Sequence, residues 1–305
     1  MDGSIYIQIK QGITEEGILP EDFSLKTETA EESIPWAPGA QDGVTIYHIN
    51  YPGLNDEEYT KMEEALKSAS AGDSAAAGRL FSELTKNVRA VSIVDELQGY
   101  IFENKDDIDA KNLFWTAVTL VKESLNPECL KIGMELLELF KHPSDIREII
   151  RTVGLYDEFT IFSVWCMMNW EDGNRDIFEL AKKVRGWGRV HAVEKLKPEN
   201  EEIRQWLLTE GCRNEVLPAY SALTCWEKAG AESILFGTPT VEEFKGLSLI
   251  IGGLLDEGPI TGISETDDPV GIINRFLEIS GNYPLTDADR GVIASARDYI
   301  DGNKT

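Results

Sequence analysis

Two side chains that could bind a metal ion, His191 and Glu194, stand three residues apart in a segment with helical apolar spacing. A helix would bring both to one face, and di-metal carboxylate sites in helical bundles use pairs of this kind. Those sites need two Glu-then-His pairs and two further glutamates. Here the order is reversed, and the chain has only three histidines, His48, His142 and His191. We therefore expect no metal site.

The sequence also contains none of the common catalytic motifs. It has no G-x-S-x-G elbow, no phosphate-binding G-x-x-x-x-G-K-S/T loop and no G-x-G-x-x-G between a strand and a helix. Gly252-Gly253 lies in an apolar segment and favours close helix packing. The acidic pairs Asp157-Glu158 and Glu201-Glu202 fall at expected helix starts, where carboxylates oppose the helix dipole. We expect no catalytic residue and no cofactor.

A basic segment, residues 182–197, is the strongest candidate for binding. It carries Lys182, Lys183, Arg185, Arg189, Lys195 and Lys197 against the single acid Glu194. It could bind an acidic peptide or a phosphate, pair with the chain's own acidic N-terminal residues, or form the solvated face of a helix. Tryptophans near expected helix ends would be exposed anchors for a partner. The candidate binding residues are Trp170, Lys183, Trp187, Arg189 and His191.

Composition narrows the class of partner. The net charge of −25 opposes binding to nucleic-acid backbones or anionic membranes, and acids strongly outnumber bases in residues 1–60 and 231–305. The chain shows neither a signal-peptide pattern nor an apolar run of about 18 residues, so we expect a cytoplasmic protein. Four cysteines without a C-x-x-C pair indicate buried, reduced thiols: Cys129, Cys166, Cys212 and Cys225.

The elements that position these residues form a pattern repeated three times between Ser144 and Trp226. Aligned on Ile146, Ile177 and Ile203, each copy has apolar residues at +3 and +4 and a glycine at +8 or +9. The copies are about 31 and 26 residues apart, which is typical of stacked helical repeats. We expect each glycine to end its helix in the left-handed conformation. A second apolar helical segment follows each one, at residues 159–170, 190–196 and 216–226.

The sequence pattern outside these repeats predicts that the chain has three regions. Residues 1–54 contain two β-branched runs, 4–9 and 43–49, that predict short strands within an irregular segment packed on the body. Residues 55–230 predict a helical-repeat domain, beginning with a capping box at Asn55 and Glu58. Residues 231–305 predict a C-terminal helical cap, with helices at 247–255, 267–277 and 286–299.

The segment Gly188 to Leu196 resembles the second helix of HEAT-type repeats, with Arg189 three residues before Ala-Val-Glu-x-Leu. This resemblance covers about 83 residues and implies an α-solenoid of antiparallel helix pairs with a face for protein partners. The predicted fold is therefore an all-α, HEAT-like solenoid with a short β-containing N-terminal cap.

The opening residues, Ile5 to Gly17 with Pro20-Glu21-Asp22-Phe23, resemble bacterial proteins called limonene hydroxylases. That resemblance implies oxidation of a small apolar terpene, although the sequence shows no haem-ligand context, flavin fingerprint or iron triad. We expect a non-enzymatic scaffold or adaptor for a protein partner. The alternatives are such a monooxygenase and an acidic mimic that binds a basic protein. The sequence leaves the oligomeric state open.

Overall fold

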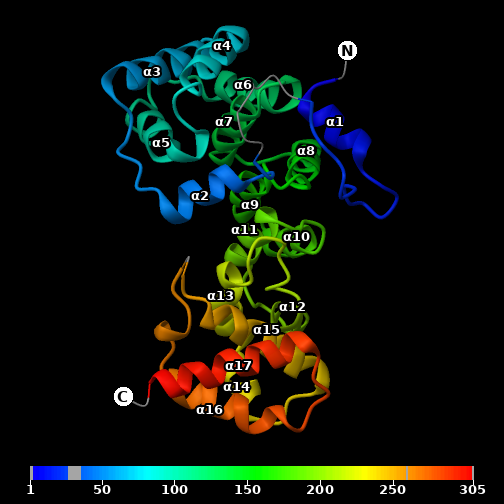
Figure 1. Cartoon of the computed structure of the whole chain (residues 1–305). Helices are drawn as coiled ribbons and strands as arrows, with labels where there is room; N and C mark the ends of the chain where they lie inside the picture. The colour runs from blue at the N-terminus through cyan, green and yellow to red at the C-terminus, as the bar shows by residue number, and fades with distance from the viewer. Residues whose placement is uncertain (1–2, 27–35, 259, 304–305) are drawn as a thin grey trace. The chain divides into compact units, whose positions relative to one another are not determined.

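The computed structural model describes residues 3–26, 36–258 and 260–303, and every regular element in these ranges is helical (Figure 1). The prediction of an all-α fold is confirmed. The chain divides into two compact units, residues 1–184 and 185–305. The helices of the first unit are α1 (Ile5–Gly12), α2 (Ala40–His48), α3 (Asp56–Ser70), α4 (Ser74–Leu84), α5 (Val94–Glu103), α6 (Ala110–Glu123), α7 (Pro127–Glu138), α8 (Ser144–Gly154), α9 (Thr160–Met168) and α10 (Gly173–Ala181).

The helices of the second unit largely match the predicted segments. They are α11 (Trp187–Lys195), α12 (Glu201–Thr209), α13 (Ala219–Ala229), α14 (Ala231–Phe236), α15 (Val241–Leu255), α16 (Pro269–Ser280) and α17 (Asp287–Gly302). Short 3₁₀ turns occur at Ala90–Ser92 in the first unit and Ile263–Glu265 in the second. Only the short α14 has no counterpart among the predicted helices.

The two predicted strands are wrong, because the structure has α1 and α2 at those positions. The side chain of Ser4 accepts a hydrogen bond from the Ile7 amide and caps α1. This helix buries Ile5, Tyr6 and Ile9, and it packs against α6 and α8. Burial of one helical face therefore outweighs the β propensity of these residues, which is a weak and context-dependent preference.

Capping explains where several helices begin. Both hydrogen bonds of the capping box predicted at Asn55 and Glu58 are present at the start of α3. Equivalent boxes begin α15, at Thr240 and Glu243, and α17, at Thr286. Each satisfies backbone amides that the first helical turn would otherwise leave unpaired.

Helices α8 and α9 form an antiparallel hairpin, and α9 also packs against α7. In the α8–α9 hairpin, Ser163 Oγ donates to the carbonyl of Ile150 at 3.1 Å. Between α7 and α9, Cys166 Sγ donates to the Met134 carbonyl at 3.4 Å, and Asn169 Nδ2 to the Glu138 carbonyl at 3.2 Å. Residue numbers rise together along these contacts, so α7 and α9 run in the same direction.

The repeated glycines do not take the predicted left-handed conformation. Gly154 lies inside α8, and a side-chain carbon there would lie 2.7 Å from Ser163 Cβ. A carbon at Gly211 would lie 2.5 Å from Cys225 Sγ. These glycines are needed for close packing, not for backbone conformation. In the second unit the left-handed helix cap is Gly230, with φ of 66°.

Close packing also explains Gly252-Gly253, as predicted. A side-chain carbon at Gly253 would lie 2.8 Å from Ala222 Cβ of α13, and one at Gly252 would lie 2.8 Å from Val292 Cγ2 of α17. Helix α15 thus approaches both neighbours through this pair. All four cysteines are buried, as expected. Within the described residues, no helix combines the length and the apolar character needed to cross a membrane.

Candidate functional site

A groove between α8 and α10 is the candidate functional site. It has a volume of about 270 Å³ and lies within the first unit. We call it the α8–α10 groove and define it by its lining residues: Ile13, Gly17, Glu148, Arg151, Thr152, Leu155, Met167, Asp176, Glu179, Leu180 and Lys183.

The spacing of residues on α8 and α10 builds the two walls. Helix α8 buries the apolar face that carries Ile146, Ile150 and Val153. Glu148, Arg151 and Leu155 recur at three- and four-residue intervals along one edge of this helix, and they line the groove. Asp176, Glu179, Leu180 and Lys183 have the same spacing on the α10 side. The groove therefore stands on two regular helices, which hold their side chains more rigidly than loops do.

The N-terminal segment forms the rim. Gly17 has a φ of 76°, and a side-chain carbon there would lie 3.4 Å from Lys183 Nζ. The segment is anchored on both sides of this turn. The amide of Ile5 donates to the Ser124 carbonyl at 3.0 Å, and the rings of Phe23 and Tyr156 meet edge to face at 5.6 Å. The rim is thus attached to the helical body.

Trp170 lies behind the wall and orients Arg151. Its indole Nε1 donates to His142 Nδ1 at 2.7 Å, while His142 Nε2 lies 2.8 Å from the Leu137 carbonyl. Burial lowers the pKa of His142, against a rise from its hydrogen bond with Leu137, and the charge of Arg147 lowers it further. Because Nδ1 accepts from Trp170, the ring hydrogen that faces the Leu137 carbonyl lies on Nε2. The guanidinium groups of Arg147 and Arg151 lie 4.9 and 5.2 Å from the ring centre of Trp170. Arg151 in turn forms a two-point pair with Asp176, at 2.7 and 3.2 Å.

We expect Trp170→Phe to lower the free energy of unfolding by about 1–2 kcal/mol, since it removes a buried hydrogen bond and part of the cation–π stack. Urea denaturation followed by circular dichroism would measure the loss. Tyr59→Phe, which changes an exposed aromatic residue in the same unit, is the control. Unchanged stability of the Trp170 variant would show that the stack contributes nothing to folding.

The five predicted binding residues belong to two different units. Lys183 is exposed and lines the groove, and Trp170 supports it from behind. Trp187, Arg189 and His191 belong to α11 in the second unit. The prediction that the tryptophans are exposed is wrong: Trp170 is 6% and Trp187 is 5% exposed.

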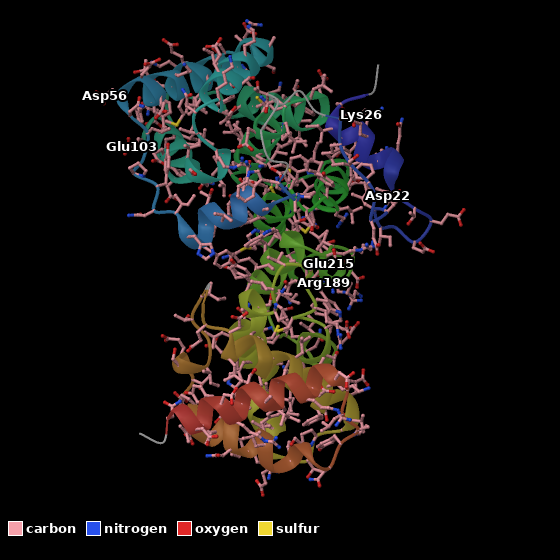
Figure 2. All side chains as sticks on the ribbon, viewed as in Figure 1. Asp22, Lys26, Asp56, Glu103, Arg189 and Glu215 are labelled. Carbon is pink, nitrogen blue, oxygen red and sulfur yellow. The ribbon has the colours of Figure 1, made fainter. Side chains whose placement is uncertain are left out.

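Packing explains the burial within α11. The ring of Trp187 stacks on that of His191, which is also buried, and lies 4.8 Å from that of Tyr220. Arg189 is half-buried beside the 213–215 segment (Figure 2). It donates to the Arg213 carbonyl at 3.0 Å and lies over the ring of Trp206 at 5.7 Å. These residues join helices of the second unit.

The first unit contains a buried group of charges that the sequence did not predict. We call it the Lys131 cluster: Asp42, Arg89, Glu128, Lys131 and Glu158. Lys131 is fully buried, and its Nζ lies 2.6 Å from Asp42, 2.7 Å from Glu128 and 2.5 Å from Glu158. Arg89 lies 2.6 Å from Asp42 and also contacts Glu128 and Glu158. Burial opposes ionisation of Asp42, but the charges of Lys131 and Arg89 outweigh it and lower the pKa of Asp42.

The Lys131 cluster holds α2 on the helical body. Asp42 belongs to α2, and the amide of Gly39 just before this helix donates to Glu158 at 2.6 Å. The sequence held one signal, which is that Lys131 and Glu135 interrupt a mainly apolar helical segment. In the structure, residues 129–137 of this helix are all buried. Arg89 and Glu158 lie far away in the sequence, so no local pattern could have identified them.

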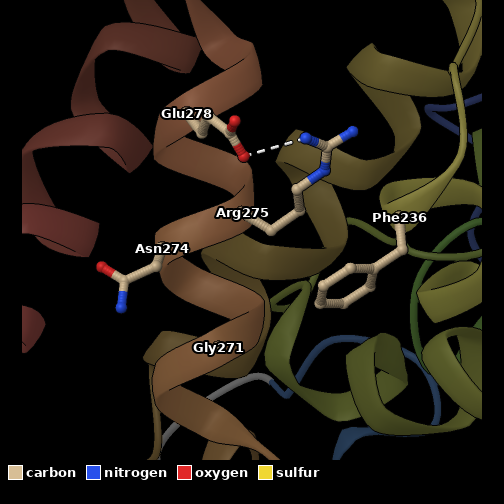
Figure 3. A pocket seen from close by; sticks show the side chains of 5 residues that line it. All are labelled: Phe236, Gly271, Asn274, Arg275 and Glu278. Atoms are coloured by element: carbon tan, nitrogen blue, oxygen red, sulfur yellow. Dashed lines mark hydrogen bonds and ion pairs between the residues drawn. The ribbon is translucent and has the colours of Figure 1, made fainter.

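Two further pockets are less well suited to binding. In the second unit, a pocket of about 590 Å³ is lined by Phe236, Gly271, Asn274, Arg275 and Glu278 (Figure 3). The guanidinium of Arg275 is already engaged within the protein, because it donates to the carbonyls of Leu235 and Gly237 and pairs with Glu278 at 2.9 Å. In the first unit, a pocket of about 510 Å³ contains Glu63, whose carboxylate accepts from Lys67 and Tyr100.

Comparison with known proteins adds no relative. No family model, no curated protein and no solved structure matches the chain.

Proposed function

We propose that this protein is a non-enzymatic scaffold that binds a short segment of a partner protein in the α8–α10 groove. The observation that carries the proposal is the composition of the groove. Buried Met167 and Leu180 and half-buried Leu155 form an apolar floor, and charged side chains form the walls. An apolar floor excludes water, and a few placed charges orient the bound segment.

The chemistry of the groove favours binding over catalysis. Its lining has no cysteine, serine or histidine that could act as a nucleophile or a base near neutral pH. Asp176 is paired with Arg151, and Glu179 is paired with Arg175 and Lys182, each at 2.9 Å. The oxygenase alternative requires a chamber for a small apolar substrate. The three pockets described above instead open to solvent and carry charged side chains.

The helical-repeat architecture that we propose supports the same function. Stacked hairpins in which α7 and α9 run in the same direction are the arrangement expected of an α-solenoid. In such a protein, grooves between successive helices of one layer recur along a continuous surface. HEAT-like repeats would therefore place the α8–α10 groove on a face used for protein partners.

Selection from a library of phage-displayed random dodecapeptides would test this proposal. We expect the full-length protein to enrich peptides that bind in the groove. Leu155→Arg should weaken their binding about tenfold or more, since it places a charge on the apolar floor. Fluorescence anisotropy with the enriched peptides would measure the change.

Ile46→Arg is the matched control, because Ile46 is an exposed aliphatic residue on α2 that does not line the groove. Circular dichroism and thermal unfolding would establish that both variants are folded. Peptides that bind the two variants equally well, or a selection that enriches nothing, would contradict the proposal.

A further inference from the structure

We infer that the segment bound in the α8–α10 groove carries an acidic side chain at the Lys183 end, a basic side chain at the Glu148 end and an apolar side chain between them. This inference rests on the proposed function and specifies the chemistry of the partner. It follows from which charges of the groove are already used and from the relative direction of its two walls.

Lys183 is the available cation of the groove. Its side chain is exposed, and its charge helps to lower the pKa of nearby Glu179. Within the described residues, no hydrogen bond or ion pair holds the Lys183 ammonium group in place. Arg151 is not equivalent, because Asp176 holds its guanidinium at two points and the Trp170 ring lies against it. A carboxylate entering the groove would therefore meet Lys183.

Glu148 is the available anion. Its side chain is 70% exposed, and its ion pair with Arg151 is long, at 3.7 Å. Asp176 is only 19% exposed and is held by Arg151, whereas Glu179 is shared by two cations. A lysine or arginine side chain would therefore find Glu148 with most of its hydrogen-bonding capacity free.

The direction of the helices puts these two groups at opposite ends. Arg151 of α8 contacts Asp176 of α10. Three residues further along α8, a side-chain carbon at Gly154 would lie 3.2 Å from Cδ2 of Leu180, which is four residues further along α10. Helices α8 and α10 therefore run in the same direction here. Glu148 precedes Arg151 by one helical turn, and Lys183 follows Leu180 by one turn. Along the helix axes, Glu148 and Lys183 are therefore roughly 13 Å apart, at 1.5 Å of rise per residue.

That separation sets the spacing of the partner's charges. An extended chain advances about 3.3 Å per residue, so a carboxylate and a cation three or four positions apart span the groove. Leu155 and Leu180 fall between these two ends along α8 and α10, and Met167 lines the same groove. These three residues would contact one apolar side chain. The fixed order of acid, apolar residue and base determines the direction in which the segment binds.

Repeating the dodecapeptide selection with charge-reversed proteins would test the inference. Peptides selected by the wild type should carry the acid–apolar–base pattern. The Lys183→Glu protein should select peptides with a basic residue in place of the acid of this pattern. The Glu148→Lys protein should select peptides with an acidic residue in place of the base. Lys183→Gln and Glu148→Gln should each weaken the wild-type peptides about fivefold, the upper range for an exposed ion pair.

The outcomes separate this inference from the proposed function. Peptides lost with Leu155→Arg but unchanged by either charge reversal would overturn the charge pattern and leave the scaffold intact. Peptides indifferent to all three substitutions would overturn both. A matching switch of preferred charge in each reversed protein, with unchanged thermal unfolding, would support the inference.

Discussion

Replacing Lys131 by methionine is expected to lower the free energy of unfolding by about 3–5 kcal/mol, the cost of breaking a buried ion pair by removing one partner. Lys131 is fully buried and lies within 2.7 Å of three carboxylates. Methionine fills a similar volume but leaves Arg89 as the only cation of the cluster. Asp42 is 1% exposed, so water cannot replace the lost partner.

Urea denaturation at pH 7 would measure this loss, with Lys67→Met as the control. Lys67 forms an ion pair of similar length with Glu63, at 2.8 Å, but its side chain is 64% exposed. Water and salt screen that pair, so its removal should leave stability nearly unchanged. The double variant Lys131→Met with Asp42→Asn should be less unstable than the sum of the two single variants, because the substituted partners interact directly. A Lys131 variant as stable as the control would mean that the cluster does not support the fold.

Replacing Glu135 by glutamine is expected to stabilise the protein at neutral pH. Glu135 is 1% exposed, and neither carboxylate oxygen has a hydrogen-bond partner within the described residues. Burial raises its pKa well above 4.5, and the nearby charges of Glu128 and Asp42 raise it further, against a smaller opposing effect of Lys131. Glu138 also contributes to the rise. Between pH 4.5 and the raised pKa of the folded state, the folded protein therefore holds a neutral acid where the unfolded chain holds a carboxylate.

The sign of the pH effect follows from this difference. Above pH 4.5 the unfolded chain releases the Glu135 proton and the folded protein retains it. The wild type therefore loses about 1.4 kcal/mol of stability per pH unit, until the pH reaches the pKa of the folded state. Glu135→Gln has no proton to release, so its advantage over the wild type should be smallest near pH 4 and grow as the pH rises.

Denaturation curves at pH 4, 5, 6 and 7 would test this prediction. The pKa of His142 is lowered by burial. Below pH 6.5 the unfolded chain therefore takes up a proton at His142 more readily than the folded protein, and the free energy of unfolding falls. That loss is common to the wild type and the variant, so it cancels in the difference between them. Glu83→Gln, at an exposed position on α4, should show no comparable dependence. A constant difference between the wild type and Glu135→Gln would show that Glu135 is ionised in the folded protein.

Most of the helices could be predicted from the amino-acid sequence, because the period of apolar residues and the local capping groups specify them over a few turns. The capping box at Asn55 and Glu58 and the close packing of Gly252-Gly253 are both present as predicted. Local signals failed where distant contacts outweigh them. The β-branched residues of α1 form a helix because that helix has α6 and α8 to pack against.

The burial of polar and aromatic groups, in contrast, follows from the tertiary structure. Trp170 and Trp187 stand near helix ends, yet His142, Tyr220 and the arginines cover them. The Lys131 cluster brings together residues from positions 42 to 158, and the α8–α10 groove joins residues 13 and 17 to residues 148–183. Exposure and charge pairing depend on neighbours far apart in the sequence, whereas helical period and capping depend on residues a few positions apart.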